Sequence, residues 1–366
     1  MTLFGIDNLP YGVFSTADGV PRIGVRLGDA VIDLSRLDLH GVFRRPALNP
    51  LLALGRPQWT LLRAQIAELA PVLPAIPLTE VRLHLPFDVA DYTDFYSSEH
   101  HAANVSRILR PANPHLPRAW KHLPIGYHGR SATVVISGTP IARPHGQLND
   151  TDFGPSARLD IEAEVGFVVG VPGSRIATED FAEHVFGVVL VNDWSARDIQ
   201  AFEYQPLGPF LAKSFATSIS PWVVPLEAFA TFPSPPQQPR PQPYLLPAGP
   251  ALDVSLRVQW NDTEVSVAPY EQMYWTAAQQ LAHLTVNGAS VRTGDLYASG
   301  TVSGPAREQA GSFLELTDNG TVPVKLADGS QRGFLLDGDT VTISATATGA
   351  RGTTIGLGSV TGTVCP

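Results

Sequence analysis

The sequence is poor in cysteine and in charge. Of its 366 residues, one is a cysteine, Cys365, and 16% are charged. A single cysteine excludes an intrachain disulfide and a metal site built from several thiolates, and it is typical of a reducing compartment. The charged fraction lies below the figure of about a quarter that is usual for soluble proteins, which favours a sizeable subunit interface.

Basic and long apolar segments are also missing. The chain has 25 Lys and Arg against 34 Asp and Glu, a formal net charge of −9. This balance argues against nucleic acid or an anionic membrane as a partner, because both attract basic patches. Residues 1–7 lack the basic region and apolar run of a signal peptide, and the most apolar stretch, residues 185–191, is too short to span a bilayer. We therefore expect a cytoplasmic protein.

Glycine and proline are abundant, with 32 and 33 residues, which favours short strands and tight turns. Apolar or alternating segments at residues 12–15, 22–27 and 30–34 predict a small β-meander, and residues 59–69 have helical spacing. We therefore expect a small β-rich domain over residues 1–86 and a larger domain over residues 87–366. The predicted fold class is mainly β, of the α+β type.

Acidic residues recur in three segments of the larger domain. Asp94 stands among phenols, Glu162 and Glu164 belong to an alternating segment, and Asp193 follows the apolar run at 185–191. Side chains two residues apart on a strand share a face, so Asp160 would lie with Glu162 and Glu164. Gathered carboxylates repel one another and need a cation, and oxygen ligands without thiols point to Mg²⁺ or Ca²⁺. Taken singly, each acid is also explained as a solvated strand face, a turn residue or a helix cap.

Two histidines begin a predicted helix. Either His100 or His101, with Ser97 or Ser98 as the N-cap, would lie next to the first acidic segment. A histidine that acts as a base needs a partner that selects its tautomer, and Glu315, flanked by apolar residues, is a candidate. A single histidine in a soluble protein is more often structural than catalytic, so the sequence pattern leaves the choice open.

A further polar set surrounds the third acidic segment. Arg197 and Gln200 fall on one side of a predicted short helix. Tyr204 and Lys213 lie in or near a Pro- and Gly-containing loop, and Tyr127 lies in a Gly-flanked segment. These side chains suit an anionic substrate, although each alone is as readily explained by packing.

Together these segments resemble the fumarylacetoacetate hydrolase family. The resemblance covers nearly the whole chain and is carried by the words DYTDFYSS, LPIGYHGR, LDIEAE, VNDWSARDIQ, PLGPFLAKSF and ASGT. It implies a small N-terminal SH3-like β-barrel, a larger C-terminal mixed β-sandwich roll of the fumarylacetoacetase type, and a homodimer. It also implies hydrolysis of the carbon–carbon bond of 4-fumarylacetoacetate to fumarate and acetoacetate, the last step of tyrosine and phenylalanine catabolism. In such enzymes a general base takes a proton from water, and the water oxygen attacks the substrate with the help of a divalent metal.

The resemblance also implies a role for each candidate residue. His101, rather than His100, matches the base, and Glu315 matches the carboxylate that orients it. Arg197, Gln200 and Lys213 match groups that stabilise developing negative charge. Residues that match substrate contacts are Tyr96, Arg110, Tyr127, Gln200, Tyr204 and Thr301.

The implied metal ligands are Asp94, Glu162, Glu164 and Asp193. Lys213 and Thr217 match positions around a second, structural magnesium ion. Asp160, although predicted on the ligand face, has no ligand role in the family.

Two alternative functions are considered. A related acylpyruvate hydrolase or a hydratase could be built on the same roll, but such chains usually lack the N-terminal domain. A non-catalytic, calcium-stabilised binding module would explain the four carboxylates but gives no reason for His101, Glu315, Arg197 or Lys213.

Overall fold

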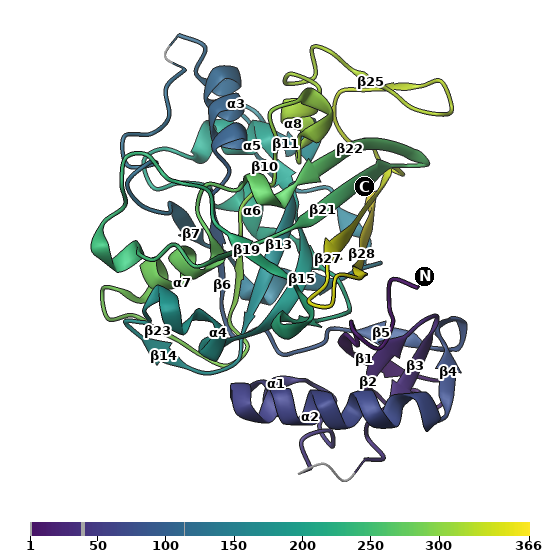
Figure 1. The fold of residues 1–366 in the computed structure, drawn as a ribbon. Coiled ribbons are helices and arrows are strands. Elements are labelled where there is room, and N and C mark those ends of the chain that lie inside the picture. Colours follow the sequence, from purple (N-terminus) through teal and green to yellow (C-terminus); the bar gives the residue numbers. More distant parts are fainter. Residues whose placement is uncertain (1, 38–40, 113) are drawn as a thin grey trace.

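A computed structural model describes residues 2–37, 41–112 and 114–366 of the chain (Figure 1). Its N-terminal part is a five-stranded antiparallel sheet in the order β4-β3-β2-β1-β5, with helices α1 and α2 beside it. The predicted meander is confirmed, because β1, β2 and β3 pair in chain order. The predicted helix is also confirmed; it starts earlier than expected because proline is tolerated in a first turn. The elements are β1 Tyr11–Ser15, β2 Arg22–Leu27, β3 Ala30–Asp33, β4 Ala75–Pro77, β5 Arg82–His84, α1 Asn49–Leu52 and α2 Arg56–Leu69.

The rest of the chain is built on an eight-stranded mixed sheet. Its order is β7-β6-β24-β13-β15-β17-β8, and β18 also pairs with β15. The buried strand predicted at residues 185–191 is confirmed as β15, which runs on to Asp193. The strands are β6 Tyr92–Phe95, β7 Gly126–His128, β8 Val134–Ile136, β13 Ala163–Val169, β15 Val185–Asp193, β17 Thr217–Ile219, β18 Val224–Pro225 and β24 Leu296–Ala298.

A second, five-stranded sheet carries the C-terminus, in the order β22-β21-β27-β28-β9. Its strands are β9 Ile141–Ala142, β21 Val254–Trp260, β22 Thr263–Pro269, β27 Thr340–Thr348 and β28 Thr354–Cys365. Two-stranded ribbons join β10 His145–Gln147 to β11 Phe153–Pro155, β12 Leu159–Asp160 to β16 Ser195–Ala196, β14 Gly173–Ser174 to β23 Ser290–Val291, β19 Thr231–Pro233 to β20 Pro250–Leu252, and β25 Val324–Lys325 to β26 Gln331–Arg332. The remaining α-helices are α3 Glu99–Leu109, α4 Phe181–His184, α5 Arg197–Glu203, α6 Leu211–Ser214, α7 Ala277–Thr285 and α8 Phe313–Leu316. The fold is therefore mainly β with short helices, as predicted. Among the described residues, every helix is too short or too polar to cross a membrane.

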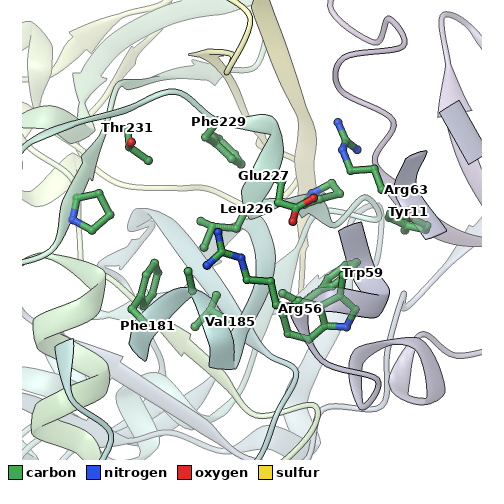
Figure 2. Close-up of a pocket in the computed structure, with 14 residues that line it drawn as sticks. Tyr11, Arg56, Trp59, Arg63, Phe181, Val185, Leu226, Glu227, Phe229 and Thr231 are labelled. Carbon is green, nitrogen blue, oxygen red and sulfur yellow. The ribbon is translucent and has the colours of Figure 1, made fainter. Parts of the chain in front are cut away.

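The N-terminal sheet joins the larger part through aromatic packing. The rings of Tyr11 and Trp59 meet the Phe186 ring edge-on, with centroids 5.6 and 5.3 Å away. A backbone bridge links Tyr11 to Val223. A cavity of about 230 Å³ lies at this junction, with Arg56 and Arg63 on its wall (Figure 2). Mixed aromatic and aliphatic burial of this kind resists separation of the two parts.

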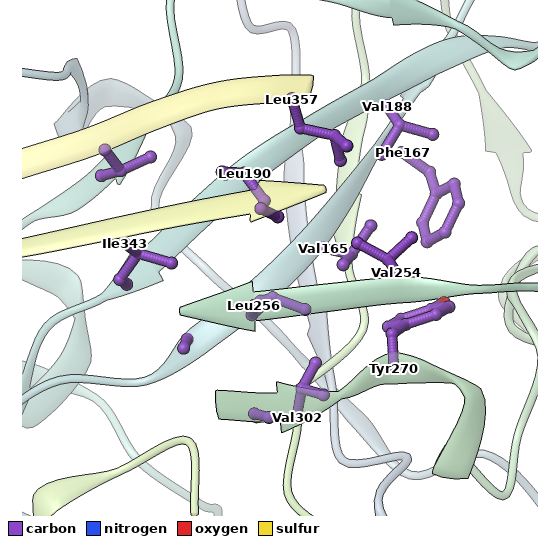
Figure 3. Close-up of a cluster of buried hydrophobic side chains, with 14 of the residues drawn as sticks. Val165, Phe167, Val188, Leu190, Val254, Leu256, Tyr270, Val302, Ile343 and Leu357 are labelled. Carbon is purple, nitrogen blue, oxygen red and sulfur yellow. The ribbon is translucent and has the colours of Figure 1, made fainter. Parts of the chain in front are cut away.

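The main core lies between the two large sheets. Val165 and Phe167 of β13 and Leu190 of β15 face Leu256 of β21 and Ile343 of β27 (Figure 3). Alternation along β21 and β27 buries every second residue, which is the pattern of a sheet with one face in a core. The sheet that carries β6, β13 and β15 is thereby held rigidly from behind.

One strand prediction is wrong in part. Residues 159–165 were expected to alternate as a single strand, but β12 ends at Asp160 and β13 begins at Ala163. β12 pairs with β16, whereas β13 pairs with β15 and β24. Because the chain changes sheets between them, the side chains of Asp160 and Glu164 no longer share a face.

We expect Val188→Ala to lower the free energy of unfolding by on the order of 2 kcal/mol, because it deletes buried methyl groups from a strand with no exposed surface at that position. Val72→Ala is the matched control, since Val72 is 79% exposed and its truncation should change stability by less than about 0.5 kcal/mol. Urea unfolding followed by circular dichroism measures both. Equal effects of the two substitutions would contradict the placement of Val188 in the core.

Candidate active site

A cavity of about 490 Å³ opens beside helices α3 and α5 and the loop at residues 204–209. It brings together side chains from segments that lie far apart in the chain. The predicted site residues on its wall are Asp94, Tyr96, His101, Arg110, Tyr127, Glu162, Arg197, Gln200, Tyr204, Lys213 and Thr301. Glu164, Asp193, Thr217 and Glu315 are buried just behind this wall or next to residues on it.

His101 lies in the first turn of α3 and is oriented by Glu315. The helix begins as predicted, with the Ser98 hydroxyl accepting from the His101 backbone N–H at 3.2 Å. The Nδ1 atom of His101 is 2.6 Å from Glu315 Oε2, and both side chains are buried. An ionised carboxylate only accepts hydrogen bonds, so Nδ1 carries a proton, and Nε2 lies 3.8 Å from Glu162 Oε1. Tyr96 packs edge-on against the imidazole at 5.4 Å and restricts its rotation.

Three residues that the sequence analysis did not single out hold Glu315 in place. Ser303 and Ser312 donate to its Oε2 at 3.0 and 2.7 Å, and Asn104 donates to Oε1 at 3.0 Å. Burial alone would raise the pKa of Glu315, but His101 and these donors lower it below its ordinary value. The spacing of Ser312 and Glu315, an N-cap three residues before an acid, is a local signal that could have been found. Ser303 and Asn104 carry no such signal.

The four predicted ligands converge at the ends of three strands. Asp94, Glu162, Glu164 and Asp193 each offer an oxygen within 4.8 Å of the others, and all four are buried. Strand pairing explains this, because β24 lies beside both β6 and β13, and β13 lies beside β15. The backbone N–H of Asp193 also donates to the carbonyl of Glu162 at 3.1 Å.

Two cations contact one side of this cluster. Lys213 Nζ lies 2.5 Å from Glu162 Oε2 and 2.9 Å from Asp193 Oδ2, and Arg197 Nη1 lies 2.8 Å from Glu162 Oε1. Burial alone would raise the pKa of Glu162, but Lys213, Arg197 and then His101 lower it far below its ordinary value. The pKa of Lys213 rises in turn, because Asp193 and Glu162 outweigh the effect of its burial. Glu162 is therefore ionised.

The other side of the cluster has an excess of negative charge. Asp94 Oδ1 and both carboxylate oxygens of Glu164 are buried without a hydrogen-bond partner among the described residues. Burial and then the neighbouring carboxylates raise the pKa of both groups well above the ordinary range. Buried carboxylates of this kind need a cation, and a divalent ion bound by oxygen ligands fits the donor set. The cluster can therefore hold a divalent metal.

Two residues that line the same cavity carry unpaired polar atoms. Arg197 Nη2 and Thr301 Oγ1 are buried and have no hydrogen-bond partner in the described part of the chain. Gln200 accepts from Arg197 Nη1 at 3.0 Å, which directs the guanidinium. Gly300 holds the Thr301 loop at φ +77°, and a Cβ there would lie 2.2 Å from the Phe95 carbonyl oxygen. Each atom therefore keeps its hydrogen-bonding capacity for another group.

The side chains of three predicted residues donate hydrogen bonds to Asp193. The Tyr127 hydroxyl donates to Asp193 Oδ2 at 2.6 Å, and the Thr217 hydroxyl donates to Asp193 Oδ1 at 3.0 Å. Lys213 Nζ also donates to Asp193. Because both side chains are engaged in this way, a second magnesium ion at Lys213 and Thr217 would need other atoms as ligands. That second metal site stays a prediction.

Asp160 does not share the face of the metal cluster, which corrects the sequence analysis. Its Oδ2 accepts from Arg197 Nε at 2.8 Å, and its Oδ1 accepts from the backbone N–H of Phe313 at 2.7 Å. The chain passes from β12 to β13 between Asp160 and Glu164, and Asp160 is not among the four acids that converge.

Comparison with known proteins decides the family. The family model of the fumarylacetoacetate hydrolase C-terminal region matches residues 91–365. The family model of the fumarylacetoacetase N-terminal region matches residues 7–86. The chain belongs to the fumarylacetoacetate hydrolase family. Fumarylacetoacetase of Homo sapiens is 46% identical over a gapped alignment of 405 positions, which covers 99% of this chain and 96% of that protein. Fumarylacetoacetase of Arabidopsis thaliana is 42% identical over 406 residues, covering 99% of this chain and 96% of that protein.

Solved structures show the same fold at low identity. A fumarylacetoacetate hydrolase from Exiguobacterium antarcticum has a TM-score of 0.62 at 19% identity, covering 98% of this chain and 99% of that chain. Maleylpyruvate hydrolase from Sphingobium sp. SYK-6, in complex with manganese (II) and pyruvate, has a TM-score of 0.60 at 16% identity. The match covers 98% of this chain and 100% of that chain. The family fold is therefore shared by enzymes with different names.

We expect Glu164→Gln to weaken Mg²⁺ or Mn²⁺ binding by more than about 100-fold, since even residues that only support metal ligands are worth 10- to 100-fold. The same substitution should stabilise the metal-free protein, because it replaces a buried carboxylate that lacks partners by a neutral amide. Isothermal titration calorimetry measures the first effect, and thermal unfolding in EDTA measures the second. Unchanged metal affinity would show that Glu164 is not a ligand.

Proposed function

We propose that this member of the family hydrolyses 4-fumarylacetoacetate to fumarate and acetoacetate. The observation that carries the proposal is the His101–Glu315 pair, whose Nε2 faces a buried carboxylate cluster in one cavity. Full-length identity above 40% to fumarylacetoacetases supports the substrate.

His101 acts as the general base in the proposed mechanism. Its Nε2 takes a proton from water, and the resulting oxygen nucleophile attacks the carbonyl carbon on the fumaroyl side. Glu315 stabilises the imidazolium that forms, as a carboxylate does beside the histidine of serine hydrolases. The partners of Glu315 keep this geometry fixed in a buried setting.

Arg197, Gln200 and Lys213 stabilise the negative charge that develops on the attacked carbonyl. Arg197 Nη2 is the best placed donor, because it is buried and has no partner among the described residues. Preorganised donors of this kind typically contribute a factor of about 10²–10³ to the rate. Collapse then breaks the carbon–carbon bond, the electron pair goes to the acetoacetate fragment as an enolate, and a proton returns to its carbon.

Asp94, Glu162, Glu164 and Asp193 would hold a divalent metal, either Mg²⁺ or Ca²⁺. When bound, it supplies Lewis-acid chemistry that delocalises charge from a poor carbanion leaving group. Elsewhere on the cavity wall, the substrate contacts are proposed to be Tyr96, Arg110, Tyr127, Tyr204 and Thr301.

The organisation of the protein is proposed from the family matches, the sheets and the composition. The separate matches to residues 7–86 and 91–365 support a division into domains at 1–86 and 87–366. The five-stranded antiparallel sheet is compatible with an SH3-like barrel, and the two larger sheets with a β-roll. The low charged fraction supports a homodimer, and the single cysteine supports a cytoplasmic location.

The deciding experiment follows the diketo absorbance of fumarylacetoacetate after adding purified protein, with and without a chelator. We expect turnover that needs a divalent metal. His101→Ala should lower kcat by about 10²–10⁴-fold, the usual contribution of a general base, and leave metal affinity unchanged.

His100→Ala is the matched control, because His100 is the next residue on α3 and does not line the cavity. It should keep the activity of the parent protein. An unmodified protein that leaves fumarylacetoacetate intact would refute the proposed substrate, and a panel of acylpyruvates would then test the related hydrolase reaction. An active His101→Ala variant would refute the base assignment alone.

A further inference from the structure

We infer that Asp160 is a positioning residue that couples the charge-stabilising arginine to the segment that orients the catalytic base. This inference rests on the proposed function and deepens it. Asp160 is fully buried, and it contacts neither the cavity nor the metal cluster among the described residues. Its carboxylate instead accepts four hydrogen bonds, one from the neighbouring N–H of Ile161 and three from two separate parts of the site.

The first part is Arg197. Asp160 Oδ2 accepts from Nε at 2.8 Å, while Nη1 contacts Glu162 and Gln200. With Nε and Nη1 both held, the planar guanidinium has one orientation, and Nη2 remains as the unpaired donor. Asp160 therefore determines where Nη2 points.

The second part is the start of α8. Asp160 Oδ1 accepts from the backbone N–H of Phe313 at 2.7 Å, and Oδ2 accepts from that of Leu314 at 3.0 Å. The next residue is Glu315, whose carboxylate binds His101. Helix α8 has four residues, so its own hydrogen bonds contribute little to its position. Asp160 thus anchors the backbone from which Glu315 projects.

An asparagine cannot replace this carboxylate. The four donors divide evenly, with the N–H groups of Ile161 and Phe313 on Oδ1 and those of Leu314 and Arg197 on Oδ2. Whichever way an asparagine amide is turned, its NH₂ group would face two donors. With NH₂ in place of Oδ2, the arginine and the α8 backbone would have to move. With NH₂ in place of Oδ1, the turn at Ile161 and the α8 backbone would have to move.

The test is steady-state kinetics and metal binding of Asp160→Asn in the full-length, metal-loaded protein with fumarylacetoacetate. Misplacement of catalytic groups by about 1 Å costs on the order of 10²-fold in rate, so we expect kcat to fall by about that factor. KM should change by less than about threefold, because a defect confined to the transition state leaves ground-state binding intact. Affinity for Mn²⁺ should also be retained, since Asp160 is not a ligand.

Asp339→Asn is the matched control. Asp339 is also a buried aspartate that accepts from an arginine Nε, that of Arg332 at 3.1 Å, and from a backbone N–H, that of Leu336 at 2.9 Å. Among the described residues it contacts none of the site groups. We expect Asp339→Asn to lower the thermal unfolding temperature, as Asp160→Asn should, and to keep the kcat of the parent protein.

The outcomes separate the inference from the function on which it rests. If the unmodified protein is inactive on fumarylacetoacetate, the proposed function fails. If it is active and Asp160→Asn keeps its kcat, the positioning role is overturned, as it is if both Asp→Asn variants lose kcat equally. Loss of Mn²⁺ affinity in Asp160→Asn would make Asp160 part of the metal site instead. If Asp160→Asn does not fold, Asp160→Glu keeps the charge but displaces the carboxylate, and an unchanged kcat there would also overturn the inference.

Discussion

The concentration of buried negative charge is the constraint on which the site depends. Four carboxylates meet within 4.8 Å beneath one cavity, where water cannot screen them. Lys213 and Arg197 neutralise the side of Glu162, while Asp94 and Glu164 are left with buried oxygens that lack partners among the described residues. An arrangement that lowers the stability of the metal-free protein is typical of a site retained for function. A divalent ion held by these four residues would resolve the repulsion and would supply Lewis-acid chemistry.

The scaffold makes this concentration of charge possible. The carboxylates sit at the ends of β6, β13 and β15, and the core behind these strands is closed by the second sheet (Figure 3). Strands paired on both sides cannot relax to separate the charges without breaking the sheet. The proposed base, His101, is held differently, through α3 and the short helix α8, which meet only in the folded chain.

Much of the local structure and most of the candidate site could be predicted from the sequence. The meander, helix α2, the start of α3 at Ser97 or Ser98 and the buried strand β15 follow from periodicity and capping, which depend on neighbouring residues. The roles of Asp94, Glu162, Glu164 and Asp193 came from the family resemblance, because each acid alone is equally well explained as a surface or turn residue. The same resemblance, and not the sequence pattern, separated His101 from His100.

What the sequence determined by itself is the set of chemical groups and the secondary structure that carries them. Only the tertiary structure decided which groups meet: Ser303 and Asn104 bind Glu315 across more than 10 and 200 residues of chain, respectively. It also kept Asp160 out of the cluster of four acids, because the chain leaves one ribbon and enters another sheet between Asp160 and Glu164. Contacts of this kind depend on how strands pair over long separations, and periodicity within a segment carries no information about that pairing.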